Sequence, residues 1–255
     1  MNDRHEQRPT HRFSGRVDAY VRYRPGYPPA LLDWLREKIG LAPSWDVADV
    51  GSGTGLLASV LLANGNRVYG VEPNDAMRAA AERALAGSPG FVSVRGTAEA
   101  TGLPDACVDL VSAAQAFHWF EPAPTRCEWK RILRPNGRAL IVFNSRRIEA
   151  SPFMRSYDDF LNAHAIDYRD VDHRRVLGER LRGFLDDPME WRHSFTVHHD
   201  FAAVKGLSAS SSYVPSPDHP AHAAFMEGLE QLFEAHAIDG RVEFLYETEA
   251  YVGKL

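Results

Sequence analysis

The chain has 255 residues, of which 44% are hydrophobic, so it is long enough to bury a sizeable core without disulfides or a structural metal. Its net charge of −5 at pH 7 gives no electrostatic case for a nucleic-acid partner. The two cysteines, Cys107 and Cys127, form neither a C-x-x-C pair nor a zinc spacing, which is typical of reduced packing residues in a cytoplasmic protein.

The N-terminal segment and the overall hydropathy indicate neither export nor membrane insertion. Residues 1–12 are polar and charged and lack the apolar segment of a signal peptide. No stretch reaches the roughly 18 apolar residues that a membrane-spanning helix needs. The histidines show no H-x-x-x-H pattern. We therefore expect a cytoplasmic protein with no membrane segment and no metal.

Helix and strand patterns alternate through the first 145 residues. A helix is predicted over residues 27–40, where Pro28 and Pro29 suit the first turn and Gly40 suits the end. The predicted strands that follow are 45–50, 67–72, 91–96, 108–114 and 138–144. The predicted helices between them are 56–65, 75–87 and 124–137. This alternation predicts an α/β fold, a Rossmann-like parallel sheet with helices on both faces.

The pattern changes after about residue 150. Residues 151–164, 173–185 and 221–237 are predicted helices, 208–217 a loop, and 190–201 and 241–255 alternating strands. The late strands predict an antiparallel C-terminal edge, and the helices after strand five predict an insertion, or lid. We expect one domain, 1–255, in four parts: an N-terminal helical cap (1–44), a core (45–145), the helical insertion (146–190), and the C-terminal strands and helix (191–255).

The stretch VADVGSGTGLLA (47–58) places three glycines between a predicted strand and a predicted helix. Glycine lets a ligand lie against bare backbone. The dinucleotide fingerprint G-x-G-x-x-G fails at Leu56, and no lysine is near for a phosphate loop. Asp49, two residues before the first glycine, would repel a pyrophosphate and favours an ammonium or sulfonium group. The loop therefore indicates a ligand without phosphate.

Glu72 ends the second predicted strand, 23 residues after Asp49. A carboxylate at this point can accept two hydrogen bonds from ribose hydroxyls. Alternatively, Glu72 only begins the turn EPNDAM. The glycine loop upstream favours the ribose-binding role.

The block from about 45 to 145 resembles the class I S-adenosylmethionine (SAM)-dependent methyltransferases. The matching motifs are DVGSGTG (49–55), GVEPNDAM (70–77), RGTAEATGLPD (95–105), LVSAAQAFHWF (110–120) and ILRPNGRALIVF (132–143). FSGRVDAYVRYRPGYP (13–28), AQAFHWF (114–120) and VEFLYETEAYVGKL (242–255) are similar to the methyltransferase type 11, trans-aconitate methyltransferase-like branch. The resemblance implies a seven-stranded sheet, SAM as cofactor and a small-molecule acceptor, often a carboxylic acid.

The resemblance also implies the cofactor site, position by position. The glycine loop would lie beside the methionine part, Asp49 near its amino group, and Thr97 where many relatives place an acidic residue for the adenine. Because Thr97 is not acidic, the contact with the adenine amino group would come instead from the Thr97 hydroxyl, the Ala98 N–H or Glu99. The implied cofactor residues are Asp49, Gly51, Ser52, Gly53, Thr54, Gly55, Glu72, Pro73, Met77, Thr97, Ala98, Glu99, Gln115, Ala116, Tyr20 and Arg24.

His118, just beyond strand four, is the candidate catalytic base, since its ordinary pKa near ~6.5 suits proton transfer. It has two alternative roles, as a pocket wall or as a structural residue. A carboxylate acceptor needs no base, and it would need a cation, for which Arg24, Arg146 and Arg147 are candidates. We expect methyl transfer to a carboxylate or hydroxyl oxygen. The remaining alternatives are a SAM-binding protein without catalysis, an NAD-linked oxidoreductase, and a nucleic-acid or protein methyltransferase.

Overall fold

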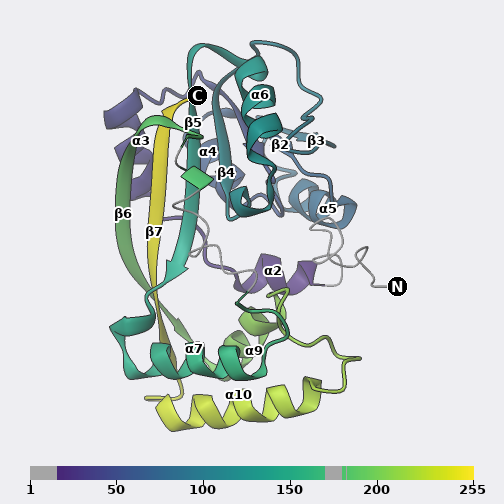
Figure 1. The fold of residues 1–255 in the computed structure, drawn as a ribbon, viewed down its shortest axis with the longest axis vertical. Helices are drawn as coiled ribbons and strands as arrows, with labels where there is room; N and C mark the ends of the chain where they lie inside the picture. The colour runs from purple at the N-terminus through teal and green to yellow at the C-terminus, as the bar shows by residue number, and fades with distance from the viewer. Residues whose placement is uncertain (1–15, 170–179, 182) are drawn as a thin grey trace.

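A computed structural model describes residues 16–169, 180, 181 and 183–255. Its centre is a seven-stranded sheet in the order β3-β2-β1-β4-β5-β7-β6 (Figure 1). The strands are β1 (Asp46–Val50), β2 (Arg67–Val71), β3 (Phe91–Val94), β4 (Val108–Ala114), β5 (Leu133–Arg146), β6 (Asp186–His199) and β7 (Val242–Lys254). β1 to β5 pair in parallel, whereas β7 pairs antiparallel with both β5 and β6. The predicted parallel sheet with an antiparallel C-terminal edge is confirmed.

Helices cover both faces of the parallel strands. Val47 and Ala48, which are neighbours on β1 and point to opposite faces, are both fully buried: Val47 packs in the cluster of Leu57 and Ala48 in the cluster of Trp129. The helices of these two layers are α3 (Ala30–Ile39), α4 (Leu56–Ala63), α5 (Asp75–Ala84) and α6 (Pro122–Ile132). Because β1, β2 and β4 are parallel, their carboxyl ends lie at one edge of the sheet, where α/β folds bind their ligands.

The long strands β5, β6 and β7 run beyond the other strands and carry a second layer of helices (Figure 1). These are α7 (Pro152–His164), α9 (Phe201–Ala209) and α10 (His222–His236). They share a separate hydrophobic cluster with β7, in which Tyr157, Phe225 and Phe244 are almost fully buried. The short helix α2 (Val17–Tyr23) lies between this layer and the upper part of the sheet and contacts both α5 and α9.

Several boundaries differ from the sequence prediction. The helix predicted over 124–137 ends at Ile132, because Leu133 already pairs with Val108 as the start of β5. Helices α2 and α9 were not predicted, and α9 occupies the first two residues of the predicted loop 208–217. The predicted helix 173–185 lies largely outside the described residues.

The predicted helices 151–164 and 221–237 are confirmed as α7 and α10. β6 also alternates as expected, with Trp191, His193, Phe195 and Val197 less exposed than the residues between them. None of the described helices combines the length and hydropathy needed to cross a membrane.

Candidate active site

The glycine loop after β1 adopts backbone angles that favour glycine at all three positions. Gly51, Gly53 and Gly55 have φ values of +66°, +55° and +85°. A Cβ on Gly51 would lie 2.7 Å from the Ala116 Cβ, and one on Gly55 would lie 2.7 Å from the Leu85 Cδ1. A Cβ on Gly53 would meet nothing within 4 Å. The rigid Ala116 Cβ therefore requires glycine at position 51, and the backbone angle favours glycine at position 55. Gly53 leaves space free beside the cavity described next.

We predict that Gly53→Ala weakens S-adenosylhomocysteine (SAH) binding by about tenfold, because the new methyl group occupies the space beside the ligand while the left-handed backbone costs about 1–2 kcal/mol of stability. Calorimetric titration measures the affinity and thermal unfolding the stability. Gly240→Ala is the matched control, since Gly240 has φ +72°, also has no atom within 4 Å of its Cβ, and lies outside the cavity. An equal loss of affinity in both variants would contradict a local role for Gly53.

A cavity of about 280 Å³ lies against this loop at the carboxyl edge of the sheet. Eleven of the sixteen cofactor residues implied by the sequence line it, namely Tyr20, Gly51, Gly53, Glu72, Pro73, Met77, Thr97, Ala98, Glu99, Gln115 and Ala116. Asn74, Ala114, Trp119 and Phe120 complete the lining. The remaining five, Asp49, Ser52, Thr54, Gly55 and Arg24, do not line it.

Glu72 joins the glycine loop to the start of α5. Its Oε2 accepts a hydrogen bond from the Gly53 N–H at 2.9 Å, and its Oε1 accepts one from the Asn74 N–H at 2.8 Å. Burial raises the pKa of this carboxyl, and these two N–H groups act in the opposite direction. Each oxygen keeps a lone pair, so the fixed carboxylate can accept hydrogen bonds from two ligand hydroxyls, and the ribose role of Glu72 stays a prediction.

Asn74 is a cavity residue that the sequence analysis missed. Its side-chain oxygen accepts hydrogen bonds from the N–H groups of Ala76 and Met77 and so caps α5. The pattern Asn-Asp before an Ala-rich helix is a helix-start signal that could have identified the cap.

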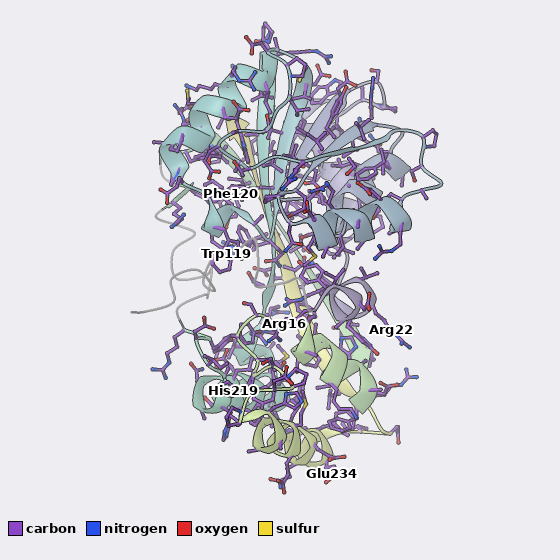
Figure 2. All side chains as sticks on the ribbon, turned by 90° about the vertical axis from the view of Figure 1, so that its right-hand side faces the viewer. Arg16, Arg22, Trp119, Phe120, His219 and Glu234 are labelled. Carbon is purple, nitrogen blue, oxygen red and sulfur yellow. The ribbon has the colours of Figure 1, made fainter. Side chains whose placement is uncertain are left out.

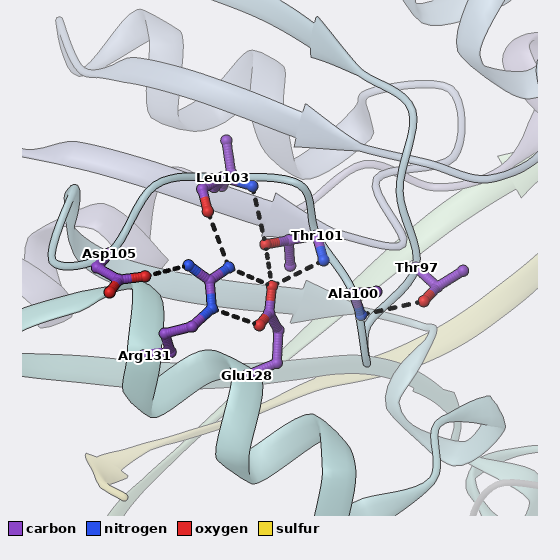
Figure 3. Close-up of polar contacts among 7 residues, drawn as sticks. All are labelled: Thr97, Ala100, Thr101, Leu103, Asp105, Glu128 and Arg131. Atoms are coloured by element: carbon purple, nitrogen blue, oxygen red, sulfur yellow. Dashed lines mark hydrogen bonds and ion pairs between the residues drawn. The ribbon is translucent and has the colours of Figure 1, made fainter.

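The segment that supplies Thr97, Ala98 and Glu99 to the cavity wall is fixed by a polar network (Figure 3). Glu128 of α6 accepts hydrogen bonds from the N–H and hydroxyl of Thr101 at 2.8 and 2.5 Å. Arg131 donates to Glu128 at 2.8 Å and pairs with Asp105 at 2.5 Å. Thr97 accepts from the Ala100 N–H at 3.2 Å, which leaves its hydroxyl proton available to a ligand. The network therefore holds the segment 97–105 against α6.

Asp49 lies beneath the loop, with 1% of its surface exposed. Its Oδ1 accepts a hydrogen bond from the Ser112 hydroxyl at 2.9 Å, and its Oδ2 is buried. Burial raises the pKa of this carboxyl to about 7, although hydrogen bonds from the Ser112 hydroxyl and the Ala58 N–H oppose the shift. Asp49 does not line the cavity, so its predicted role toward an ammonium group would act through water or through the field of the buried charge.

This pKa predicts that SAH affinity falls as the pH falls. Below pH 7 Asp49 is mostly protonated in the free protein and no longer attracts an ammonium group, so we expect about a tenfold loss between pH 8 and pH 6. Calorimetric titration with SAH at several pH values between 6 and 8 measures this loss of affinity. In Asp49→Asn the affinity should be weak and flat with pH. A pH slope that survives in this variant would assign the titration to another group.

A second cavity, of about 140 Å³, adjoins the first and shares Tyr20, Gln115 and Trp119 with it. Arg146, at the end of β5, lines it. Its Nη2 donates to the hydroxyls of Tyr168 at 2.9 Å and Tyr213 at 3.4 Å, and its guanidinium lies 5.2 Å from the Tyr157 ring centroid. Among the described residues no carboxylate pairs directly with Arg146. A half-buried cation without a direct carboxylate partner among the described residues leaves this cavity positively charged.

Arg24 lines the second cavity and not the first, where the sequence analysis had placed it. Its Nε donates to the Ser210 hydroxyl and its Nη2 to the Ser211 hydroxyl, each at 2.9 Å, and the guanidinium stacks on Tyr20 at 5.2 Å. Arg147, also expected near the mouth, is exposed and borders neither cavity.

Arg16 fastens the N-terminal cap over this region. It donates to the carbonyls of Ala209, Ser211 and Val214 at 2.6 to 2.9 Å. Figure 2 places Arg16 between the upper part of the molecule, which carries Trp119, and the lower helices. Arg16 therefore joins the N-terminal cap, whose Tyr20 borders both cavities, to the loop after α9, which lines the second cavity.

His118 lies in a short 3-10 helix, η1 (Phe117–Trp119), and lines the second cavity. Its ring contacts those of Trp119 and Phe143, with centroids 4.7 and 5.9 Å away. Gln115, with φ +55°, donates to the Asn144 carbonyl at 2.8 Å at the junction of the two cavities. The position fits a pocket wall, and the role of His118 as a base stays a prediction.

The strand order, the glycine loop after β1 and the cavity at the carboxyl edge define a class I methyltransferase fold. Residues 48–141 match the methyltransferase domain family. The chain is 34% identical over 224 residues to an uncharacterized methyltransferase of Mycobacterium tuberculosis, covering 88% of this chain and 86% of that protein. An uncharacterized methyltransferase of Mycobacterium bovis matches equally well.

The structure is similar to that of a proposed type II methyltransferase from Anaeromyxobacter dehalogenans, with a TM-score of 0.70 and 26% identity over 91% of this chain and 98% of that one. The chain therefore belongs to the class I SAM-dependent methyltransferases, and SAM is its cofactor. The names of these relatives specify no methyl acceptor.

Proposed function

We propose that the protein transfers a methyl group from SAM to an oxygen of a small acid that binds in the second cavity. The observation that carries this proposal is Arg146, a cation without a direct carboxylate partner among the described residues, in a cavity that adjoins the cofactor cavity. A hydroxyl on such an acid is the alternative acceptor. The proposed carboxylic acid agrees with the trans-aconitate methyltransferase-like resemblance.

SAM, when bound, supplies a methyl carbon that is already attached to a good leaving group, the sulfonium. The Glu72 carboxylate would hold the ribose hydroxyls, and the bare backbone of Gly51 and Gly53 would lie beside the methionine part. Arg146 would orient the acid, and Tyr20 and Trp119, which border both cavities, would exclude water from the reacting atoms. Such positioning can contribute roughly 7–11 kcal/mol to lowering the barrier.

The charges of the second cavity favour an acceptor that is already an anion. No Asp or Glu is among the described residues that line it, and His118 is the one lining residue there whose ordinary pKa lies near neutral. A carboxylate oxygen attacks without losing a proton, so the reaction then requires no base.

We therefore predict that the His118→Phe substitution lowers kcat/KM by less than about tenfold. The decrease of kcat/KM at low pH should be the same in this variant as in the unchanged protein. Phenylalanine keeps the contact with the Trp119 and Phe143 rings. Steady-state rates between pH 5.5 and 8.5 make the test. A loss of 10²–10⁴-fold, the usual contribution of a general base, would instead indicate a hydroxyl acceptor with His118 as the base.

The proposed function is tested by SAH release with a panel of small carboxylic acids and the alcohols of matched chain length, with products identified by mass spectrometry. Methyl esters formed from acids alone support the proposal. Formation of methyl ethers would show that the acceptor group is a hydroxyl and not a carboxylate. SAH binding without turnover on any member of the panel would favour a SAM-binding protein without catalysis.

A further inference from the structure

The sheet ends in a long strand whose outer edge is open. β6 is the last strand of the sheet and, within the described part of the chain, pairs only with β7 (Figure 1). The backbone groups of residues 187–198 make no backbone hydrogen bond to other described residues outside that ladder. In an antiparallel strand every second residue directs its N–H and C=O away from the neighbouring strand. β6 therefore presents a row of unpaired donors and acceptors.

The usual protections of an open edge are confined to the beginning of β6. A proline or a bulge prevents an edge strand from pairing with another chain. β6 has Pro188 and a register shift between Asp186 and Met189. The eleven residues 189–199 that follow pair with β7 in one unbroken register and contain no proline. Most of the edge is therefore regular and able to pair.

We infer that this edge binds the same edge of a second copy of the chain, as an antiparallel pair of β6 strands with its two-fold axis at Ser194. Ser194 is the midpoint of residues 189–199, so this axis pairs the whole regular part of the strand with itself. A ladder of this length supplies about ten hydrogen bonds. It joins two seven-stranded sheets into one continuous sheet.

The charges on the exposed face of β6 are complementary about this axis. The axis places Glu190 of each copy opposite His198 of the other. Glu190 has no ion-pair partner among the described residues, and the His198 Nε2 lies 3.1 Å from Glu243, so this histidine already pairs with carboxylates. Opposite charges facing each other stabilise an antiparallel pair.

The neighbouring positions of the axis are less favourable. An axis at Phe195 would place Arg192 opposite His198, and like charges facing each other destabilise the pair. An axis at His193 would bring Pro188 into the ladder opposite His198, and proline cannot donate to a ladder. The charges and the proline therefore favour the axis at Ser194.

The other face of β6 carries half-exposed apolar and aromatic side chains that a second copy would cover. These side chains are Trp191, His193, Phe195 and Val197. The axis places Trp191 opposite Val197 and His193 opposite Phe195 of the second copy. Aromatic side chains facing each other, or facing a β-branched one, stabilise an antiparallel pair. Both faces of the strand thus complement their own copy.

Sedimentation velocity of the full chain over the micromolar range tests the inference, and we expect a species of twice the mass of one chain. Thr196, which is exposed in the single chain, lies opposite Arg192 of the second copy about this axis. Thr196→Arg therefore creates two pairs of like charges and should raise the dissociation constant of the dimer about tenfold or more. The matched variant Thr196→Glu creates two pairs of opposite charges and should keep or lower that constant.

A disulfide tests the position of the axis directly. The axis brings the two Cβ atoms of residue 194 about 4.5–5.5 Å apart, close to disulfide geometry. Ser194→Cys, combined with Cys127→Ser to remove the exposed cysteine, should form a linked dimer on mild oxidation. Ser216→Cys in the same background is the control, because Ser216 is exposed in a loop outside β6, and it should stay unlinked.

A monomer at all concentrations up to the millimolar range would overturn the inference. So would equal dissociation constants for Thr196→Arg and Thr196→Glu, or a dimer that Ser194→Cys does not link, since either result would place the interface elsewhere. The disulfide decides alone if Thr196→Arg does not fold. No residue of β6 lines either cavity, so these results are independent of the proposed function.

Discussion

Replacing Glu72 with alanine is expected to weaken SAH binding by about 100-fold or more. The carboxylate is 8% exposed and already fixed by the N–H groups of Gly53 and Asn74. A hydrogen bond to a charged group is worth about 1.5–3 kcal/mol, so losing two bonds to the ribose costs at least about 3 kcal/mol, roughly 150-fold in affinity. Calorimetric titration with SAH makes the measurement.

The control for this variant is Glu82→Ala. Glu82 lies on the same helix, α5, is exposed, and accepts a hydrogen bond from the Ser93 hydroxyl outside the cavity. Its removal should leave SAH affinity unchanged. Glu72→Gln keeps the size of the side chain and covers the case in which the alanine variant unfolds. Binding of SAH to folded Glu72→Gln at the affinity of the unchanged protein would contradict the ribose role.

The cofactor side of the protein could be predicted from the sequence because its residues lie in short segments directly after strands. Gly51, Glu72 and Gln115 follow β1, β2 and β4 closely, and a parallel sheet brings these strand ends together. The position of Asp49 below the cavity was harder to predict. Its side chain points toward Ser112 of the neighbouring strand, a contact that depends on the register of β1 with β4.

The boundaries that differ from the prediction follow from tertiary contacts. The segment after α6 carries a helical pattern, but pairing with β4 converts Leu133 and the following residues into β5. α2 is held by packing of Val17 against Met77 and by contacts with α9, which lie far away in the sequence. A helix as short as α2 is marginal without such packing, so its own sequence predicts it weakly.

The second cavity was the least predictable part, because its residues come from many separate segments between Tyr20 and Tyr246. Tyr157 lies on α7, Tyr168 after it, Tyr213 in the loop after α9, and Tyr246 on β7. Tyr157, Tyr168 and Tyr246 are buried and Tyr213 is half-buried, so the sequence around each of them is typical of a core residue. Their common feature, a cation at the centre, is visible only once the end of β5 places Arg146 among them.

Arg146→Gln is expected to lower kcat/KM for the acceptor by 100-fold or more and at the same time to raise the free energy of unfolding. The loss of activity follows because a charge-assisted pair with a carboxylate is removed. The gain follows because Arg146 is half-buried and pairs directly with no carboxylate among the described residues. The partial loss of hydration of its charge is offset only in part by two aromatic faces at 5.2 and 5.4 Å and by two phenols. We expect a net gain of about 1 kcal/mol, or about 2 °C in the unfolding midpoint.

Steady-state kinetics with thermal unfolding of the same preparation measures both effects, and Arg147→Gln should change neither. The combination separates a binding role from a structural one. If Arg146 served only to hold Tyr157, Tyr168 and Tyr213 together, its removal would lower stability and would leave turnover of the surviving folded protein largely unchanged. Binding sites often keep charged groups that lower the stability of the free protein. Loss of activity together with a gain in stability would therefore place the anion of the acceptor at Arg146.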